Sequence, residues 1–404
     1  MPSTPPEGQP APADGHLPAG ALSGLPGRGL SLYVHVPFCA SRCGYCDFNT
    51  YTASELGAAP GASQEAYLAA VTAELELAGR VLGGDAPAVQ SVFFGGGTPT
   101  LLPAPALAGI LAEVRRRFPL ADGAEVTTEA NPESIDRAYL DTLVTAGFTR
   151  LSLGMQSARP GVLAVLERRH TPGRVGDVVA SARAAGFGSL SLDLIYGSPT
   201  ETLDDWRQSL RTALDHQPDH LSAYSLIVEP GTRLAARIGR GELPGVDDDF
   251  AADCYLLAEE LLTAAGYSAY EVSNWARPGH ESRHNLAYWL GHDWWGIGPG
   301  AHSHVGGVRW WNVRHPREYS ARLAAGVSPA QARETLTADD RRLERVLLEL
   351  RLSRGLPRHV LTASEQARVP GLVASGLLVV DGEQLRPTLR GRLLADGIVR
   401  DLLD

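Results

Sequence analysis

Three cysteines in the segment HVPFCASRCGYCDFNTY could carry metal chemistry. Cys39, Cys43 and Cys46 have the spacing C-x3-C-x2-C and follow an apolar, strand-like run. Three thiolates in one loop can ligate three irons of a 4Fe-4S cubane, whereas clusters used only for electron transfer normally have four cysteine ligands. The fourth iron would then be open to the amino and carboxylate groups of S-adenosylmethionine (SAM). We therefore expect a 4Fe-4S cluster that binds SAM.

A zinc site is the main alternative for these cysteines. Cys254 or His35 could complete a four-coordinate site of the Cys and His type. Zinc sites usually show paired C-x2-C motifs, however, and only one such pair occurs here. Cys254 lies in the apolar, helix-like stretch AADCYLLAEELL, which is typical of a buried small side chain. The sequence thus favours the cluster, and clustered free thiols favour a reducing cytoplasm over a disulfide framework.

A repeated pattern indicates which elements position this loop. Between Leu30 and Pro230, strand-like runs alternate with stretches that carry apolar residues at helical spacing. Repeated strand-helix units predict a parallel sheet, with chemistry at the carboxyl ends of its strands. We expect residues 29–231 to form an α/β fold whose parallel sheet is either open or curved into a full or partial barrel. Its strands would be LSLYVHV, VQSVFFGG, EVTTEAN, RLSLGMQS, SLSLDLIYG and HLSAYSLIVEP.

The remaining chain divides into three further regions. Residues 1–28 are rich in Pro, Gly and Ala without a hydrophobic period, which predicts a disordered leader. Residues 232–330 form an extension that is rich in Trp and His and irregular in pattern. Residues 331–404 begin with an amphipathic helix and include the hairpin-like GLLVVDGEQLRPT, which predicts a winged-helix-like α+β domain.

Composition limits the classes of partner. The 404-residue chain has a formal net charge of -10 and no basic stripe, so we expect no nucleic-acid partner. Arginines of the C-terminal region alternate with acids and hydrophobes, as on a solvated amphipathic helix. No apolar run is long enough to predict a transmembrane segment, and the start of the chain lacks the features of a signal peptide. We expect a cytoplasmic protein with small-molecule or protein partners.

Several further motifs accompany the cysteine loop. They are FFGGGTPT, EANPE, RLSLGMQS, LERRH, DLIYGSP, AYSLIVEPGT and HNLAYW. Together with CGYCDFN they resemble the radical SAM superfamily, and within it the oxygen-independent coproporphyrinogen III dehydrogenase group, most closely its heme chaperone branch. The resemblance runs from about Leu30 to the C-terminus. It implies that residues 29–231 form a partial parallel (β/α)6 barrel of radical SAM type, with a 4Fe-4S cluster and SAM as cofactors.

The resemblance also implies a set of SAM-binding residues. Carboxylates can accept hydrogen bonds from amino or hydroxyl groups, Arg can pair with a carboxylate, and Gly lets a backbone approach a ligand. Taken singly, such residues could equally be a helix cap, a surface charge or a strand-end acceptor. The implied residues are Tyr33, Tyr45, Gly96, Gly97, Thr98, Glu129, Gln156, Arg168 and Asp193.

Two positions separate the branches of this group. The dehydrogenases have a fourth Cys two positions after the third cluster cysteine, where this chain has Phe48. The segment HNLAYW resembles the HNxxYW motif of the heme chaperone branch, which implies that His284 ligates heme. Without that resemblance, His284 could simply stabilise a loop while its aromatic neighbours join the core. Nearby candidates for the ligand are His280, His292, His302 and His304.

The first hypothesis is therefore a heme chaperone that binds a 4Fe-4S cluster, SAM and heme and delivers heme to acceptor hemoproteins. It implies an electron donor for the cluster and allows a homodimer. The second hypothesis is an oxygen-independent coproporphyrinogen III dehydrogenase, in which a radical generated from SAM drives oxidative decarboxylation. Phe48 in place of the fourth Cys weighs against that enzyme.

Overall fold

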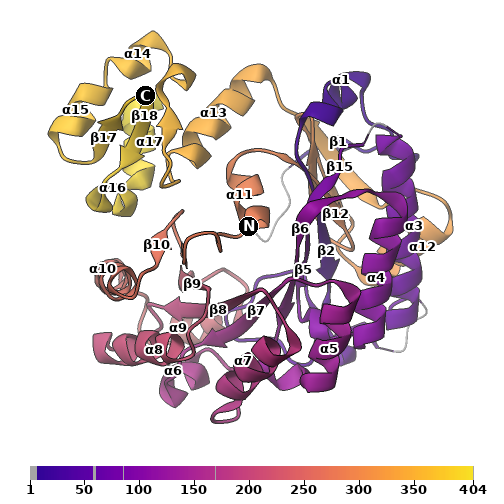
Figure 1. The fold of residues 1–404 in the computed structure, drawn as a ribbon, viewed down its shortest axis with the longest axis horizontal. Coiled ribbons are helices and arrows are strands. Elements are labelled where there is room, and N and C mark those ends of the chain that lie inside the picture. The colour runs from indigo at the N-terminus through magenta and orange to yellow at the C-terminus, as the bar shows by residue number, and fades with distance from the viewer. Residues whose placement is uncertain (1–6, 58–60, 85, 169, 404) are drawn as a thin grey trace.

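Six parallel strands form the centre of the molecule. The computed structural model describes residues 7–57, 61–84, 86–168 and 170–403. The strands pair side by side in chain order and form an open, curved sheet (Figure 1), which confirms the expected partial barrel. They are β2 (Leu30–Val36), β5 (Val89–Gly96), β6 (Leu120–Ala130), β7 (Arg150–Gln156), β8 (Ser189–Tyr196) and β9 (His220–Ser225).

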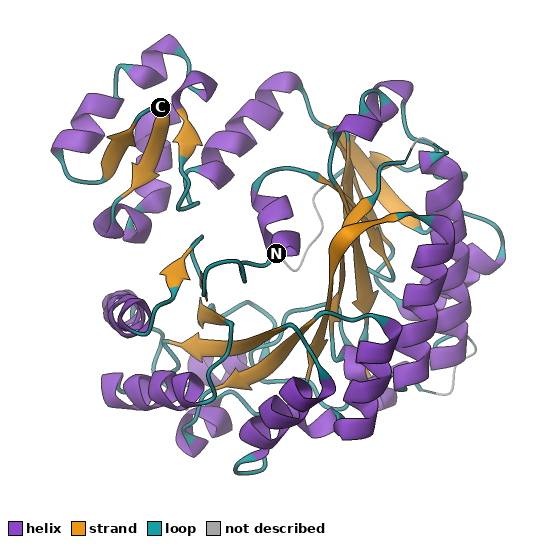
Figure 2. Ribbon diagram, viewed as in Figure 1, coloured by secondary structure: helices purple, strands orange, loops and turns teal. Residues whose placement is uncertain are grey.

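Helices between these strands cover the convex face of the sheet (Figure 2). They bury apolar side chains at helical spacing, as Leu107, Leu111 and Val114 do in α4. The helices are α3 (Gln64–Leu82), α4 (Ala104–Arg117), α5 (Arg137–Ala146), α6 (Pro160–Val165), α7 (Arg174–Ala185) and α8 (Leu203–Asp215).

The two faces of the sheet differ because successive side chains of a strand alternate. In β7, for example, Leu151 and Leu153 lie in the apolar core, while Arg150, Ser152 and Gln156 line the concave side. The same alternation of Leu or Val with Ser, Thr, His or acidic residues recurs in the other strands. The concave side, which we call the lumen, is therefore polar.

The Trp/His-rich extension is more regular than its sequence suggested. Strands from it lengthen the sheet at both edges: β11 (Asn274–Ala276) and β10 (Ser268–Ala269) follow β9, and β12 (Asp293–Ile297) pairs in parallel with β2. Strands β13 (His302–Val305), β14 (Val308–Asn312) and β15 (Ala330–Thr335) continue from β12. Its helices are α9 (Arg233–Gly239), α10 (Asp248–Ala264), α11 (Arg283–Trp289) and α12 (Pro316–Ala324).

The expectation of a disordered leader is wrong for residues 7–28, and residues 1–6 lie outside the described residues. Strand β1 (Gln9–Pro10) pairs with β15, and α1 (Ala19–Leu22) follows it. Leu17, Ala21 and Leu25 are buried in the main core. These three apolar residues recur every four positions, and this period was hidden in the sequence by the Pro and Gly residues around them.

The C-terminal region has a core of its own. It contains α13 (Ala338–Glu349), α14 (Ala363–Gln366), α15 (Val369–Ala374), α16 (Leu389–Leu393) and α17 (Ala395–Leu403). Beside them lies a three-stranded antiparallel sheet of β16 (Leu356–Pro357), β18 (Gln384–Pro387) and β17 (Leu378–Asp381). A bidentate ion pair from Arg392 to Glu259 ties it to α10. The domain boundaries given above stay a prediction.

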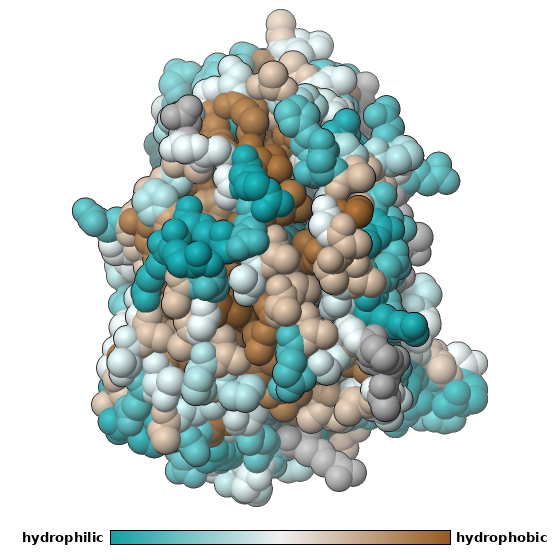
Figure 3. All heavy atoms as spheres, turned by 90° about the vertical axis from the view of Figure 1, so that its right-hand side faces the viewer, coloured by the Kyte–Doolittle hydropathy of each residue, from teal (hydrophilic) through white to brown (hydrophobic). Residues whose placement is uncertain are grey.

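The outer helical face mixes hydrophilic and hydrophobic side chains (Figure 3). Among the described residues, no helix is both long and apolar enough to cross a membrane.

Candidate cluster and cofactor site in the lumen

A cavity of about 1440 Å³ occupies the lumen. Ligand sites usually measure about 300–1,000 Å³, so this volume can hold more than one ligand. The residues that the sequence analysis selected for the cluster and SAM all line this one cavity, and so does His284, the first candidate for the heme ligand. They are Tyr33, Cys39, Cys43, Tyr45, Cys46, Gly96, Gly97, Thr98, Glu129, Gln156, Arg168, Asp193 and His284.

The cysteine loop begins where β2 ends. Cys39 closes the short strand β3 (Phe38–Cys39), which pairs with β4 (Tyr51–Thr52) and so closes the loop on itself. Gly97 passes so close that a Cβ there would lie 3.0 Å from Cys39 Sγ. The glycine motif therefore allows β5 to end directly against the cysteines.

Burial and neighbouring charges set the chemistry of the thiols. Burial, with a contribution from Cys46, raises the pKa of Cys39 to about 11. A guanidinium nitrogen of Arg168 donates to Cys43 Sγ at 3.4 Å, and Thr98 Oγ1 donates to Cys39 Sγ at 4.0 Å. Such thiols lose their protons when a metal binds them.

The three thiols border one shared volume. In the described part of the chain, no three His, Cys, Asp or Glu side chains meet closely enough to hold one metal ion. The thiols of a cubane surround a volume, because each one ligates a different iron. Cys39, Cys43 and Cys46 all border the same cavity, as three ligands of one cluster must.

Two carboxylates, Glu129 and Asp193, line the same cavity as the cysteine loop. Glu129 accepts a hydrogen bond from the backbone nitrogen of Gly96 at 3.2 Å, and Asp193 accepts from Ser152 Oγ at 3.0 and 2.9 Å. Burial, and then the charge of Asp193, raises the pKa of Glu129 to about 8. A bound ammonium group would favour the ionised carboxylate, so this pair suits a cationic ligand such as SAM.

Other predicted SAM residues surround these carboxylates. Gln156 has φ 64° at a register shift in β7, a left-handed conformation that is uncommon outside glycine and turns the side chain toward the cavity. Arg168 donates to the carbonyl of Gly154 at 3.4 Å. Tyr33 contacts His35 through its hydroxyl at 3.0 Å, and Tyr45 packs against the apolar cluster around Leu166.

His284 lies in α11, which enters the lumen from the extension. Only 2% of its surface is exposed, and burial lowers the pKa of its imidazole to about 3. The ring stacks on Phe93 with centroids 5.1 Å apart. Its Nδ1 lies 2.8 Å from Ser91 Oγ, and its Nε2 lies 3.1 Å from the hydroxyl of Tyr288. The Tyr288 hydroxyl therefore covers Nε2.

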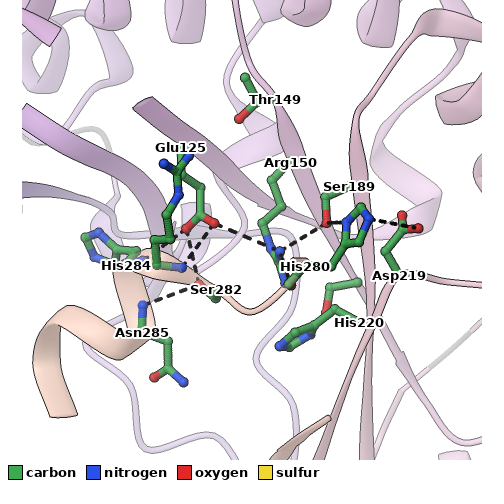
Figure 4. A network of polar contacts seen from close by, with 12 residues as sticks. Glu125, Thr149, Arg150, Ser189, Asp219, His220, His280, Ser282, His284 and Asn285 are labelled. Carbon is green, nitrogen blue, oxygen red and sulfur yellow. Dashed lines mark hydrogen bonds and ion pairs between the residues drawn. The ribbon is translucent and has the colours of Figure 1, made fainter. Parts of the chain in front are cut away.

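The N-terminus of α11 is held by a charged pair on two neighbouring strands (Figure 4). Glu125 on β6 accepts hydrogen bonds from the backbone nitrogens of Arg283 at 3.1 Å and His284 at 3.0 Å. Arg150 on β7 lies 4.0 Å from Glu125 and donates to the carbonyl of His280 at 2.8 Å. The barrel thus fixes where His284 lies.

Sequence reasoning missed the other lumenal histidines. His170 and His220 line the cavity. The alternative heme ligands His280, His292, His302 and His304 are not among its lining residues in the described structure. The period-2 alternation of the strands could have revealed His220, because it occupies a lumenal position of β9.

Comparison with known proteins identifies the family. A family model described as the Radical SAM superfamily matches residues 33–213. The heme chaperone HemW of Mycobacterium tuberculosis (strain CDC 1551 / Oshkosh) is 52% identical over 382 residues, which cover 95% of this chain and 97% of that protein. The chain belongs to the HemW family of radical SAM proteins. HemW of Escherichia coli (strain K12) is 39% identical over 295 residues, which cover 72% of this chain and 75% of that protein.

One solved structure has a fold similar to that of this chain. Coproporphyrinogen III oxidase (HemN) from Escherichia coli, described as a radical SAM enzyme, superposes with a TM-score of 0.80 at 26% identity. The match covers 95% of this chain and 92% of HemN. Residue 48, where the dehydrogenase pattern has a Cys, is an exposed phenylalanine at the cavity of this HemW-family chain.

Proposed function

We propose that this protein is a heme chaperone. It binds a 4Fe-4S cluster through Cys39, Cys43 and Cys46, binds SAM beside the cluster, and takes up heme at His284 for delivery to acceptor hemoproteins. SAM contacts come from the two lumenal carboxylates, the glycine turn and the side chains around them. When bound, the cluster supplies an open iron for the amino and carboxylate groups of SAM.

The observation that carries this proposal is that one cavity is lined by both the three thiols and His284. A neutral imidazole is the form that ligates iron, and the low pKa of His284 keeps it neutral. Phe93 and Tyr288 supply aromatic surface next to it. The close relatives with the printed name heme chaperone HemW support the same assignment.

Coproporphyrinogen III oxidation is the second candidate, favoured by the likeness to HemN. Phe48 weighs against it, because the dehydrogenases carry a thiol at that position and the aromatic ring supplies none. Under the chaperone proposal, the acceptors are hemoproteins, an external donor reduces the cluster, and the protein acts in the cytoplasm as a monomer or homodimer.

The test uses the full chain reconstituted anaerobically with iron and sulfide. One sample receives heme and then an apo-hemoprotein, and heme transfer is followed by absorbance. A second sample receives SAM, a low-potential reductant and coproporphyrinogen III, and porphyrin products are followed by chromatography. We expect heme transfer and no protoporphyrin beyond one equivalent. Multiple turnovers to protoporphyrin without heme transfer would overturn the proposal.

A further inference from the structure

Ser91 lies where it can decide which nitrogen of His284 carries the proton. It is a buried lumenal residue of β5, and its hydroxyl donates to Ser31 Oγ at 2.8 Å. A hydroxyl has a single proton, so toward His284 Nδ1, at 2.8 Å, Ser91 Oγ can only accept. Nδ1 therefore carries the hydrogen of the neutral imidazole.

This tautomer leaves the other ring nitrogen, Nε2, without a proton. Nε2 of His284 holds the lone pair and accepts the hydrogen bond from the Tyr288 hydroxyl at 3.1 Å. Tyr288 lines the cavity, so the lone pair lies at the wall of the cavity behind a single hydroxyl. Tyr288 is held in place by Trp294, whose ring centroid lies 4.8 Å away.

We infer that Ser91 is a positioning residue that fixes the Nδ1–H tautomer of His284 and so presents Nε2 as the ligand for heme iron. This inference rests on the proposed heme site and deepens it. Partners of the second ring nitrogen orient a metal-bound histidine and strengthen it as a donor. Ser31, Ser91 and His284 form a chain that runs from the sheet to this nitrogen.

The protein offers a matched control on the neighbouring strands β8 and β9 of the same lumen. Ser191 donates to Asp193 at 3.5 Å and lies 2.7 Å from His220 Nδ1. His220 Nε2 contacts the hydroxyl of Tyr270 at 2.9 Å. Ser191→Ala therefore removes the same hydrogen bond from a histidine that is not the proposed ligand.

The experiment measures heme binding and the iron–histidine stretching band of the ferrous complex by resonance Raman spectroscopy. Ser91→Ala is expected to shift the band to lower frequency and to weaken heme binding about 10- to 100-fold, the usual effect of losing such a partner. Ser191→Ala should leave both readouts unchanged. His284→Ala should abolish the band.

The outcomes separate this inference from the proposed function. If His284→Ala abolishes the band and Ser91→Ala keeps it at the wild-type frequency, Ser91 has no positioning role and the heme site stands. If His284→Ala binds heme as wild type does, both the heme site and the inference are overturned. Alanine fits the space of serine on β5, and cluster absorbance confirms that the variant is folded.

Discussion

Two Ser-His-Tyr chains in the lumen have the same internal geometry and different surroundings. Ser91, His284 and Tyr288 form one, with distances of 2.8 and 3.1 Å. Ser191, His220 and Tyr270 form the other, with distances of 2.7 and 2.9 Å. In both, burial is the main cause of a lowered imidazole pKa. Local hydrogen bonding alone therefore does not mark a ligand.

The two histidines differ in the residue that their Nε2 atom contacts. Tyr288 lines the cavity, and its hydroxyl covers the lone pair of His284. Tyr270 is not among the cavity-lining residues of the described structure, and its hydroxyl also accepts from Asn285 Nδ2 at 3.3 Å. His220 lines the cavity too, but its Nε2 contacts Tyr270, which is not among the described lining residues, whereas Nε2 of His284 contacts Tyr288, which is.

The largest expected difference comes from removing each imidazole. His284→Ala should weaken heme binding more than about 100-fold, beyond the loss caused by a supporting residue. His220→Ala should change heme affinity less than about threefold, because its Nε2 faces Tyr270. Anaerobic heme titration followed by absorbance measures both. If both variants lost heme affinity equally, the proposed difference between His284 and His220 would be wrong.

A second difference is how each histidine is held. His220 begins a central strand, whereas His284 depends on the cap that Glu125 gives to α11 (Figure 4). Glu125→Ala leaves buried N–H groups without an acceptor and should lower the free energy of unfolding by about 1–3 kcal/mol. Heme affinity should fall roughly tenfold, within the range for supporting residues.

The control for this change is Glu125→Gln, which keeps one acceptor oxygen for the backbone of α11. It should recover most of the heme affinity in the same titration, while denaturant unfolding reports the stability of both variants. SAM binding, which we propose to involve Glu129 and Asp193 rather than Glu125, should stay at the wild-type level. A loss of SAM binding equal to the loss of heme binding would mean that Glu125 supports the whole fold.

The sequence predicted the six strands and the cysteine loop because apolar periodicity and metal-ligand spacing are local signals. It did not predict the partners of His284. Ser91, Glu125 and Arg150 are separated from it by more than a hundred residues. Nothing in the sequence distinguishes them from other polar strand residues, because their contacts around α11 form only in the folded sheet. The ordered leader was missed for a related reason, since Leu17 and Ala21 gain their partners only in the folded core.

A smaller effect of opposite sign is expected at the two tyrosines. Tyr288→Phe keeps the ring but removes the hydroxyl that competes with iron for Nε2. One hydrogen bond is worth about 0.5–1.5 kcal/mol, so heme should bind about 2- to 10-fold more tightly. Tyr270→Phe should instead lower stability by about 1 kcal/mol without tightening heme binding. Weaker binding in Tyr288→Phe would indicate that the hydroxyl assists the bound heme.

The smallest expected effect is the change of heme affinity with pH. The pKa of His284 falls from about 6.5 in an unfolded chain to about 3 in the folded protein because of burial. Between these values the unfolded chain binds the proton and the folded chain does not, so the free energy of unfolding decreases as pH falls from about 6.5 to about 3. Heme affinity should nevertheless stay level between about pH 5 and pH 8, since the folded imidazole is neutral throughout. An exposed histidine ligand would lose about tenfold in affinity per pH unit below 6.5, so such a slope in the titration would show that iron binds a different histidine.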